Sequence, residues 1–222
     1  MVAQTATQPE EHKSVSNLQQ QFGPIDIYLF DQLLRDRITP GMRVLDAGCG
    51  SGRNLVYLLR EGYEVFGADQ DSQAIDAVRR LAGSLASALP QNSFRVEPVE
   101  SMSFEDAFAD LVISSAVLHF ARDDDQFNAM LRGTWRVLKP GGLLFCRLAS
   151  SIGIENQVKS IAARRFLLPD GSQRYLVDEP LLTKFTKELG GELADPLKTT
   201  VVQNQRSMTT WVVYKNRTNR AR

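Results

Sequence analysis

The residues with the clearest chemical meaning are three glycines at alternate positions, Gly48, Gly50 and Gly52. An apolar run at 43–45 precedes them, and leucines at helical spacing follow over 53–61. The order of strand, glycine turn and helix is half of a βαβ unit. Because glycine has no Cβ, the backbone can turn sharply there and approach a ligand closely. Free N–H groups at the start of the helix favour a polar or anionic ligand group.

A carboxylate follows at a useful distance from the loop. Asp69 ends a second apolar run at 64–68, about twenty residues past the glycines. An acid at that strand end can accept hydrogen bonds from both ribose hydroxyls of a nucleoside, although it could instead cap the next helix. The dinucleotide fingerprint Gly-x-Gly-x-x-Gly is weakened, because Arg53 occupies its last glycine position. A P-loop is excluded, because Gly-Lys-Ser/Thr is absent.

Residues 46–52, Asp-Ala-Gly-Cys-Gly-Ser-Gly, resemble motif I of class I S-adenosylmethionine-dependent methyltransferases. Asp69 matches the ribose-binding acid of that family, and residues 138–144 match the turn before its fifth strand. The Gly-Arg-Asn end of the motif, with Gly62-Tyr63, is closest in motif to the tellurite-resistance and thiopurine-like branch. The resemblance covers the chain from about Thr39 onward. It implies S-adenosylmethionine as cofactor, S-adenosylhomocysteine as product and in-line methyl transfer as the reaction.

The resemblance also implies where the cofactor lies. Its amino-acid end would rest on the glycine loop, its ribose on Asp69 and its methionine moiety near the end of strand 110–115. The acid that contacts adenine in relatives falls at Pro98 here, so the backbone of Val99 and the carboxyl of Glu100 are expected to replace it. The expected cofactor-binding residues are Asp46, Gly48, Cys49, Gly50, Asn54, Asp69, Gln70, Val99, Glu100 and Ser114.

Methyl transfer from a sulfonium requires a well-placed acceptor and exclusion of water rather than a catalytic triad. His119, after the fourth strand, is the candidate general base, because the pKa of histidine lies near neutrality. The alternative is that His119 is a partly buried structural residue. Tyr28, His119 and Arg147 are the candidate substrate-binding residues. Arg147 and Arg53 could bind an anionic acceptor or form salt bridges.

Alternating strands and helices predict an α/β, Rossmann-like, doubly wound sheet. We expect five parallel strands closed by a C-terminal antiparallel hairpin, seven strands in all, with helices on both faces. The strands are expected at 43–45, 64–68, 93–96, 110–115, 142–148, 198–203 and 208–214, and the helices at 53–61, 72–81, 123–138 and 179–189. Residues 164–175 are interpreted as a turn-rich insertion, where substrate loops often lie in the resembled family.

The ends of the chain differ from its centre. Residues 1–17 are polar and unpatterned, which predicts a mobile tail, and 18–222 are expected to form one methyltransferase domain. An amphipathic helix begins near Ile25 as an N-terminal helical cap, which could cover the edge of the sheet or close over the cofactor as a lid. Residues 215–222 carry four basic side chains, a pattern more typical of a chain terminus than of a nucleic-acid tail.

Composition narrows the remaining possibilities. The 26 basic and 26 acidic residues give a net charge of zero, which provides no general attraction to nucleic acid or membranes. Cys49 and Cys146 have no cysteine or histidine at metal spacing, so we expect free thiols and no metal. No apolar run reaches the ~18 residues of a membrane helix, and the first residues lack a signal-peptide layout. A cytoplasmic monomer or homodimer acting on a small molecule is expected.

Two other functions remain open at this point. The first is a non-catalytic S-adenosylmethionine-binding regulatory protein on the same fold, because a fold does not determine a function. The second is an NAD-dependent oxidoreductase. Arg53 in the glycine motif and the terminal hairpin argue against the second function.

Overall fold

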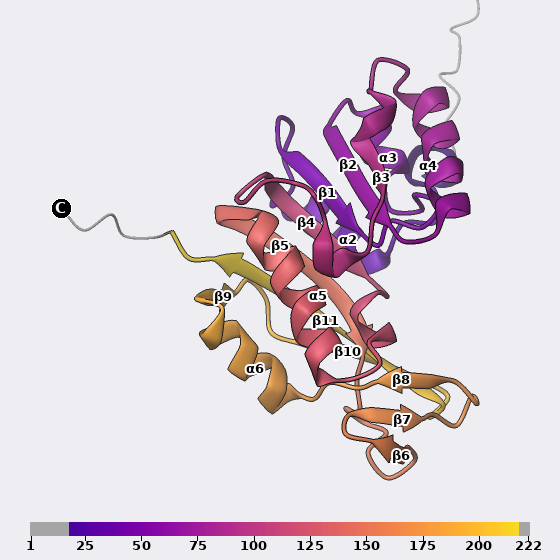
Figure 1. Ribbon diagram of the computed structural model, residues 1–222, viewed down its shortest axis with the longest axis vertical. Coiled ribbons are helices and arrows are strands. Elements are labelled where there is room, and N and C mark those ends of the chain that lie inside the picture. Colours follow the sequence, from indigo (N-terminus) through magenta and orange to yellow (C-terminus); the bar gives the residue numbers. More distant parts are fainter. Residues whose placement is uncertain (1–17, 218–222) are drawn as a thin grey trace, which may run out of the picture.

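A computed structural model of the chain describes residues 18–217 (Figure 1). The tail expected at 1–17 and the end of the basic segment 215–222 lie outside the described residues. Two β-sheets are present in the described part, one of eight strands and one of three. The large sheet contains β1 (Arg43–Ala47), β2 (Glu64–Asp69), β3 (Phe94–Val96), β4 (Ala109–Ser115), β5 (Leu138–Ala149), β9 (Gly191–Leu193), β10 (Lys198–Val202) and β11 (Arg206–Lys215).

The large sheet has the predicted doubly wound topology. Its order is β10-β11-β5-β4-β1-β2-β3, and the five strands from β5 to β3 run parallel. β11 pairs antiparallel with both β5 and β10, so a C-terminal hairpin closes the sheet. The expected Rossmann-like fold is confirmed. β9 adds a strand that was not predicted, because its three residues, Gly-Glu-Leu, are too few and too polar to give a strand signal.

Helices cover both faces of the large sheet. They are α1 (Leu18–Phe22), α2 (Ile27–Leu34), α3 (Val56–Arg60), α4 (Ser72–Leu85), α5 (Asp124–Val137) and α6 (Glu179–Glu188). α2, α3 and α4 pack on one face with Leu111, Ile113 and Phe145, while α5 and α6 pack on the other with Val112 and Trp211. Neighbours on β4 thus enter opposite cores, as the two-residue period of a strand requires. None of the helices within 18–217 is long and apolar enough to cross a membrane.

The segment predicted as a turn-rich insertion is a small antiparallel sheet instead. It consists of β6 (Lys159–Ala162), β7 (Arg165–Leu167) and β8 (Gln173–Tyr175), and it lies at the lower end of Figure 1. Turns remain only in the links between these strands, at 163–164 and within 168–172, where the N–H of Gly171 donates to the carbonyl of Leu168. The strands escaped prediction because all four residues of β6 are exposed, so no apolar alternation marks them.

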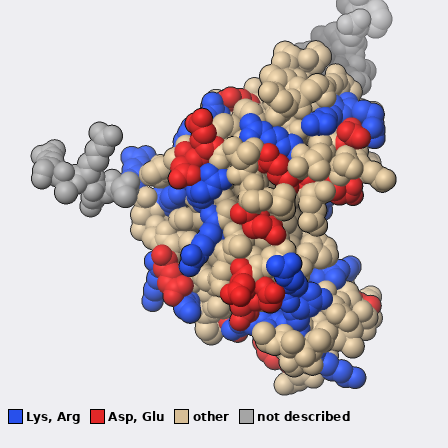
Figure 2. All heavy atoms as spheres, viewed as in Figure 1, with Lys and Arg blue, Asp and Glu red and all other residues tan. Residues whose placement is uncertain are grey.

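The N-terminal helix covers a face of the sheet. Leu29 of α2 is buried with Phe145 of β5 and Val212 of β11. Asp31 of α2 also forms an ion pair with Lys198 of β10, at 2.8 Å. The helix therefore lies over the β5, β11 and β10 part of the sheet. On the face shown in Figure 2, acidic and basic side chains are interspersed, and the surface is indented above the small sheet.

Candidate active site

The glycine loop between β1 and α3 is held against the end of β2. The N–H groups of Gly48 and Cys49 both donate to the carbonyl oxygen of Ala68, at 2.8 and 3.0 Å. The N–H of Gly50 donates to Oδ2 of Asp69 at 2.9 Å. Gly48 and Gly50 have φ values of +84° and +52°, in the left-handed region that favours glycine. The acid predicted to bind ribose therefore also anchors the loop.

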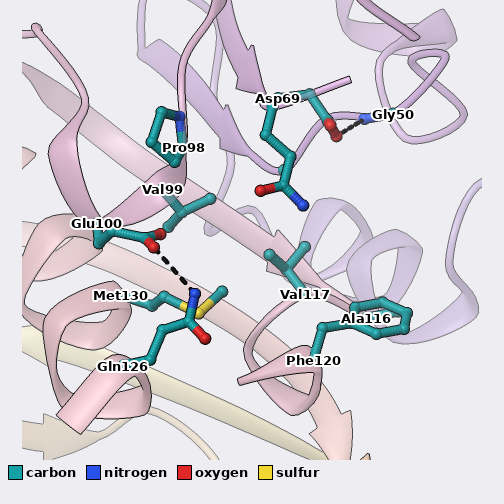
Figure 3. A pocket seen from close by; sticks show the side chains of 12 residues that line it. Gly50, Asp69, Pro98, Val99, Glu100, Ala116, Val117, Phe120, Gln126 and Met130 are labelled. Atoms are coloured by element: carbon teal, nitrogen blue, oxygen red, sulfur yellow. Dashed lines mark hydrogen bonds between the residues drawn. The ribbon is translucent and has the colours of Figure 1, made fainter. Parts of the chain in front are cut away.

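A cavity of about 330 Å³ opens beside this loop and is called the first cavity below. Six of the ten predicted cofactor-binding residues line it: Gly48, Gly50, Asp69, Gln70, Val99 and Glu100. The other four are buried and do not line it: Asp46, Cys49, Asn54 and Ser114. Figure 3 shows Asp69 on one side of the cavity, with its carboxylate turned toward Gly50, and Glu100 on another side.

Glu100 is held in place from the opposite element. Nε2 of Gln126, in the first turn of α5, donates to Oε1 of Glu100 at 3.0 Å (Figure 3). Pro98, where relatives were expected to carry an acid, lines the same wall without a carboxylate. Of the two carboxylates that line the cavity, the one on Glu100 is nearer to Pro98 in the sequence.

Five lining residues of the first cavity were not predicted: Ala116, Val117, Phe120, Gln126 and Met130. The first three follow β4, and the carboxyl ends of strands form the ligand crevice of an open α/β sheet. This rule could have indicated them. Gln126 and Met130 lie one helical turn apart on α5, and an ordinary amphipathic helix gives no signal that distinguishes a cavity wall from a core face.

Asp46 lies beneath the loop with 2% of its surface exposed. Burial raises the pKa of its carboxyl to about 7, Arg53 opposes this shift, and the negative charge of Asp69 adds to it. A cationic group bound nearby would stabilise the ionised carboxylate and lower that pKa. Asp46 is therefore suited to meet a positive charge in the site.

The stability of an Asp46→Asn variant tests this buried carboxyl. The folded chain keeps the Asp46 proton up to about pH 7, whereas an unfolded chain loses it near pH ~4. Because the folded state binds more protons between these values, the contribution of Asp46 to stability falls as the pH rises. Urea unfolding at about pH 5 and about pH 7.5 should show a larger fall in wild type than in Asp46→Asn. Equal changes would contradict the raised pKa of Asp46. The contribution of His119 to the pH dependence cancels in this comparison, because both proteins contain it.

Position 48 requires glycine for two reasons: its φ is positive, and a neighbouring side chain leaves no space for a Cβ. A Cβ on Gly48 would lie 2.5 Å from Cγ2 of Val117, whereas a Cβ on Gly50 would meet nothing within 4 Å. Alanine at either position costs ~1–2 kcal/mol for its left-handed backbone, and only Gly48→Ala adds overpacking, worth ~1–3 kcal/mol. Urea unfolding should therefore show a larger destabilisation for Gly48→Ala than for Gly50→Ala. Combining Gly48→Ala with Val117→Ala should give a favourable coupling energy, and zero coupling would refute the contact.

A second cavity, of about 420 Å³, adjoins the first. Ala116 lines both, so the two cavities lie on either side of it. Ala116 has a φ of +64°, in a region that alanine rarely adopts, and its N–H donates to the carbonyl of Arg147 at 2.7 Å. Of the predicted substrate-binding residues, His119 and Arg147 line the second cavity and Tyr28 lines neither.

His119 is buried, with 5% of its surface exposed. Its Nδ1 accepts a hydrogen bond from the N–H of Ala149 at 3.2 Å, which leaves the proton of the neutral ring on Nε2. Burial, and the nearby charge of Arg174, lower the pKa of His119 to about 4. The ring is therefore neutral at physiological pH, with its free lone pair already engaged by the backbone.

No role was predicted for Asp26, yet it joins several site residues. Its buried carboxylate accepts from Nη1 of Arg147 at 2.9 Å and lies 3.8 Å from Nη2 of Arg53. It also caps α2 by accepting from the N–H of Tyr28, and its own N–H donates to Oδ1 of Asn54. The capping role could have been inferred locally, because aspartate is a preferred residue at the start of a helix. Its pairing with Arg147, 121 residues away, has no local signal.

Tyr28 supports the same group of residues. The guanidinium of Arg147 lies over its ring, 5.2 Å from the centroid, and its hydroxyl is 2.6 Å from Oγ1 of Thr200. Within 18–217, no set of three or more histidine, cysteine or acidic residues is arranged to hold a metal ion.

Residues 45–146 match the family described as "Methyltransferase domain". All residues that line the first cavity fall within this segment.

The curated relatives share the same part of the chain. An uncharacterized methyltransferase of Synechocystis is 35% identical over 48% of this chain and 46% of its own. A ubiquinone biosynthesis O-methyltransferase of Methylocella silvestris is 34% identical over 51% and 43%. A tRNA 5-carboxymethoxyuridine methyltransferase of Escherichia coli is 27% identical over 56% and 46%. The chain thus spans about half the length of the curated relatives it matches.

Solved structures extend the likeness over most of the fold. A SAM-dependent methyltransferase from Methanosarcina mazei has a TM-score of 0.66 at 23% identity, covering 83% of this chain and 97% of that one. A Burkholderia thailandensis 1,6-didemethyltoxoflavin-N1-methyltransferase, solved with S-adenosylhomocysteine, has a TM-score of 0.67 at 17% identity, covering 90% and 81%. The fold is therefore the Rossmann-like fold of class I S-adenosylmethionine-dependent methyltransferases. The family match itself covers residues 45–146, which is less than half of the chain.

Proposed function

We propose that the chain is a methyltransferase that binds S-adenosylmethionine in the first cavity, transfers its methyl group to a small-molecule acceptor and releases S-adenosylhomocysteine. The observation that carries this proposal is the Asp69 carboxylate at the end of β2, which anchors the glycine loop and lines the cavity.

The residues present fit this cofactor. A carboxylate has about four acceptor sites, and the N–H groups of Gly50 and Asp71 use two of those on Asp69. Two remain for the hydroxyls of a ribose. Across the cavity, Glu100 offers an acceptor for the amino group of adenine. Asp46 does not line the cavity, but the charge of its buried carboxylate would attract the ammonium of the methionine end.

When bound, the cofactor supplies a sulfonium-activated methyl group. An acceptor lone pair would take up this methyl group, and S-adenosylhomocysteine would leave with the electron pair of the broken carbon–sulfur bond. A proton on the acceptor leaves to water or to a base. The residues of this chain hold the acceptor in line and exclude water from it. Ala116, between the two cavities, would stand beside the line of transfer.

We assign His119 to positioning. Its Nδ1 is engaged by the backbone of Ala149, and a base with a pKa of about 4 is weak at neutral pH. Nε2–H can instead donate to an acceptor in the second cavity.

His119→Asn separates placement from base catalysis, because the Asn oxygen can still accept from the N–H of Ala149 while the side chain cannot act as a base. Turnover to S-adenosylhomocysteine should stay within ~10-fold of wild type, with an unchanged pH profile. A loss of ~100-fold or more, with cofactor affinity intact, would assign base catalysis to His119.

The acceptor class and cellular setting are part of the proposal. The two adjoining cavities favour a small molecule over nucleic acid, although one relative is named for tRNA. We further propose that the protein is a cytoplasmic monomer or homodimer. Tyr28 would contribute to acceptor binding indirectly, by supporting the guanidinium of Arg147. The match to the tellurite-resistance and thiopurine-like branch rests on Gly52-Arg53-Asn54, Gly62-Tyr63 and Asp69.

The test is production of S-adenosylhomocysteine by the full chain with a panel of hydroxylated, amino and thiol small molecules and with tRNA. Product with a small molecule supports the proposal. Tight binding of S-adenosylhomocysteine without turnover of any acceptor would instead favour a non-catalytic binding protein. Binding of NAD but not of S-adenosylhomocysteine would favour an oxidoreductase.

A further inference from the structure

Four arginines from four separate segments line the second cavity. Arg53 follows the glycine loop, Arg147 belongs to β5, Arg174 to β8 and Arg206 to β11. Asp170 is the carboxylate that lines the cavity with them. Equal numbers of acidic and basic residues in the whole chain make this local excess of cations a specific feature of the cavity.

Nearby carboxylates do not neutralise these cations. Arg53 and Arg147 share one buried carboxylate, that of Asp26. Asp170 accepts from the N–H and the hydroxyl of Ser172, at 2.9 and 2.6 Å. Hydrogen bonds from Ser172, and then the charges of Arg206 and Arg174, lower the pKa of Asp170, so it is ionised at neutral pH. Four guanidinium groups against these two carboxylates leave an excess of two positive charges.

Two of the arginines are available to a ligand. Arg174 donates to the carbonyl of Gln173 and lies over the ring of Phe120, 4.8 Å from its centroid. Neither Arg174 nor Arg206 forms an ion pair with a carboxylate in residues 18–217. Because Phe120 lines the first cavity, Arg174 of the second cavity contacts a residue of the proposed cofactor site.

A third arginine has an unused donor. Nε of Arg147 is buried and has no hydrogen-bond partner in the described part of the chain. A buried donor without a partner costs ~1–3 kcal/mol, and nearly all such groups in proteins are satisfied by protein, water or ligand. Nε2–H of His119 is a further donor on the same wall. The wall therefore offers donors and positive charge, which suit a ligand group rich in acceptors.

Part of the remaining wall of the second cavity is apolar. Leu168, Val202 and Met208 contribute side chains from the small sheet and the hairpin. At about 420 Å³ the cavity has the size of a small-molecule pocket. A ligand that fits it has an apolar body and an anionic group, and Ala116 places it next to the first cavity.

We infer that the second cavity is the acceptor site and that it selects a small molecule carrying a carboxylate or phosphate group, held by Arg174, Arg206 and Arg147. This inference rests on the proposed methyltransferase function. Arginine is suited to the role, because its planar fork donates two parallel hydrogen bonds to either anion.

The inference is tested by calorimetry on the full chain saturated with S-adenosylhomocysteine. The probes are benzoate, phenyl phosphate and the neutral analogue benzamide. Hydrogen bonds to a charged group are worth roughly 1.5–3 kcal/mol, so the better anion should bind ~10-fold or more tightly than benzamide. Which anion binds better decides between carboxylate and phosphate.

Arg206→Gln and Arg174→Gln should each remove ~10-fold of that anion affinity. Neither arginine forms a short ion pair within residues 18–217, and Asp170, on which their charges act, is also held by Ser172, so both variants should keep the fold. Arg165→Gln is the matched control, because Arg165 lies on the adjacent β7, lines neither cavity and should leave anion binding unchanged.

Three results would overturn the inference: benzamide binding as tightly as both anions, no binding of either anion, or an equal loss in Arg165→Gln. Methylation of tRNA alone, among all acceptors tried, would also overturn it in favour of a nucleic-acid substrate. Failure of S-adenosylhomocysteine to bind in the first titration is a separate outcome, which would reject the proposed function itself.

Discussion

Replacing Asp69 with alanine should weaken the binding of S-adenosylhomocysteine by ~100-fold or more. If Asp69 binds the ribose as proposed, the variant loses two hydrogen bonds from ribose hydroxyls to a carboxylate, each worth roughly 1.5–3 kcal/mol. It also loses the bond that holds the N–H of Gly50, which loosens the loop. Calorimetric titration of wild type and variant measures the effect directly. An unchanged dissociation constant would contradict the assignment of Asp69 as the residue that binds ribose.

Two controls separate ribose binding from loop anchoring. Asp71→Ala removes a neighbouring acid that caps α4, so it should cost ~1 kcal/mol of stability and leave affinity unchanged. Adenosine and 2′,3′-dideoxyadenosine provide the second control. If Asp69 binds the hydroxyls, Asp69→Ala should weaken adenosine much more than its dideoxy analogue. Equal weakening of both would mean that Asp69 acts only through the loop.

Asp26→Ala should lower the free energy of unfolding by ~3–5 kcal/mol. The carboxylate is buried and paired with Arg147, so its removal leaves a largely buried guanidinium without its partner, and α2 also loses its cap. Urea unfolding checks this value. The matched control is Asp31→Ala, on the same helix, whose partly exposed pairs with Arg35 and Lys198 are worth ~1 kcal/mol or less each. Similar losses in the two variants would show that the Asp26 pair is no stronger than a surface pair.

Most of the fold could be predicted because its strands carry apolar runs that a parallel sheet buries on both faces. The run at 110–115 became β4, with every residue but one buried. The C-terminal hairpin formed as expected, but its turn is residues 203–205 and not 204–207, because Arg206 already pairs with Val202. Local patterns could not reveal β6–β8 or β9. Their few residues are exposed or polar, and pairing with distant strands stabilises them rather than their own alternation.

The candidate site, like the fold, could be predicted only in part. The place of Gly48, Gly50 and Asp69 beside one cavity could be predicted, because it follows from adjacent chain geometry, a turn between a strand and a helix. The group of four arginines in the second cavity could not be predicted, because they come from four segments that only the tertiary fold brings together. Arg147 was expected to bind either an acceptor or a carboxylate. The structure pairs one of its Nη groups with Asp26 and leaves its Nε without a partner, a division that no spacing encodes.

A crystal structure of the full chain with S-adenosylhomocysteine tests the central claim most directly. The account predicts ribose hydroxyls within hydrogen-bond distance of Asp69, adenine beside Glu100 and the sulfur at Ala116, facing the arginines of the second cavity. A ligand bound elsewhere, or a sulfur that faces away from Ala116, would contradict it.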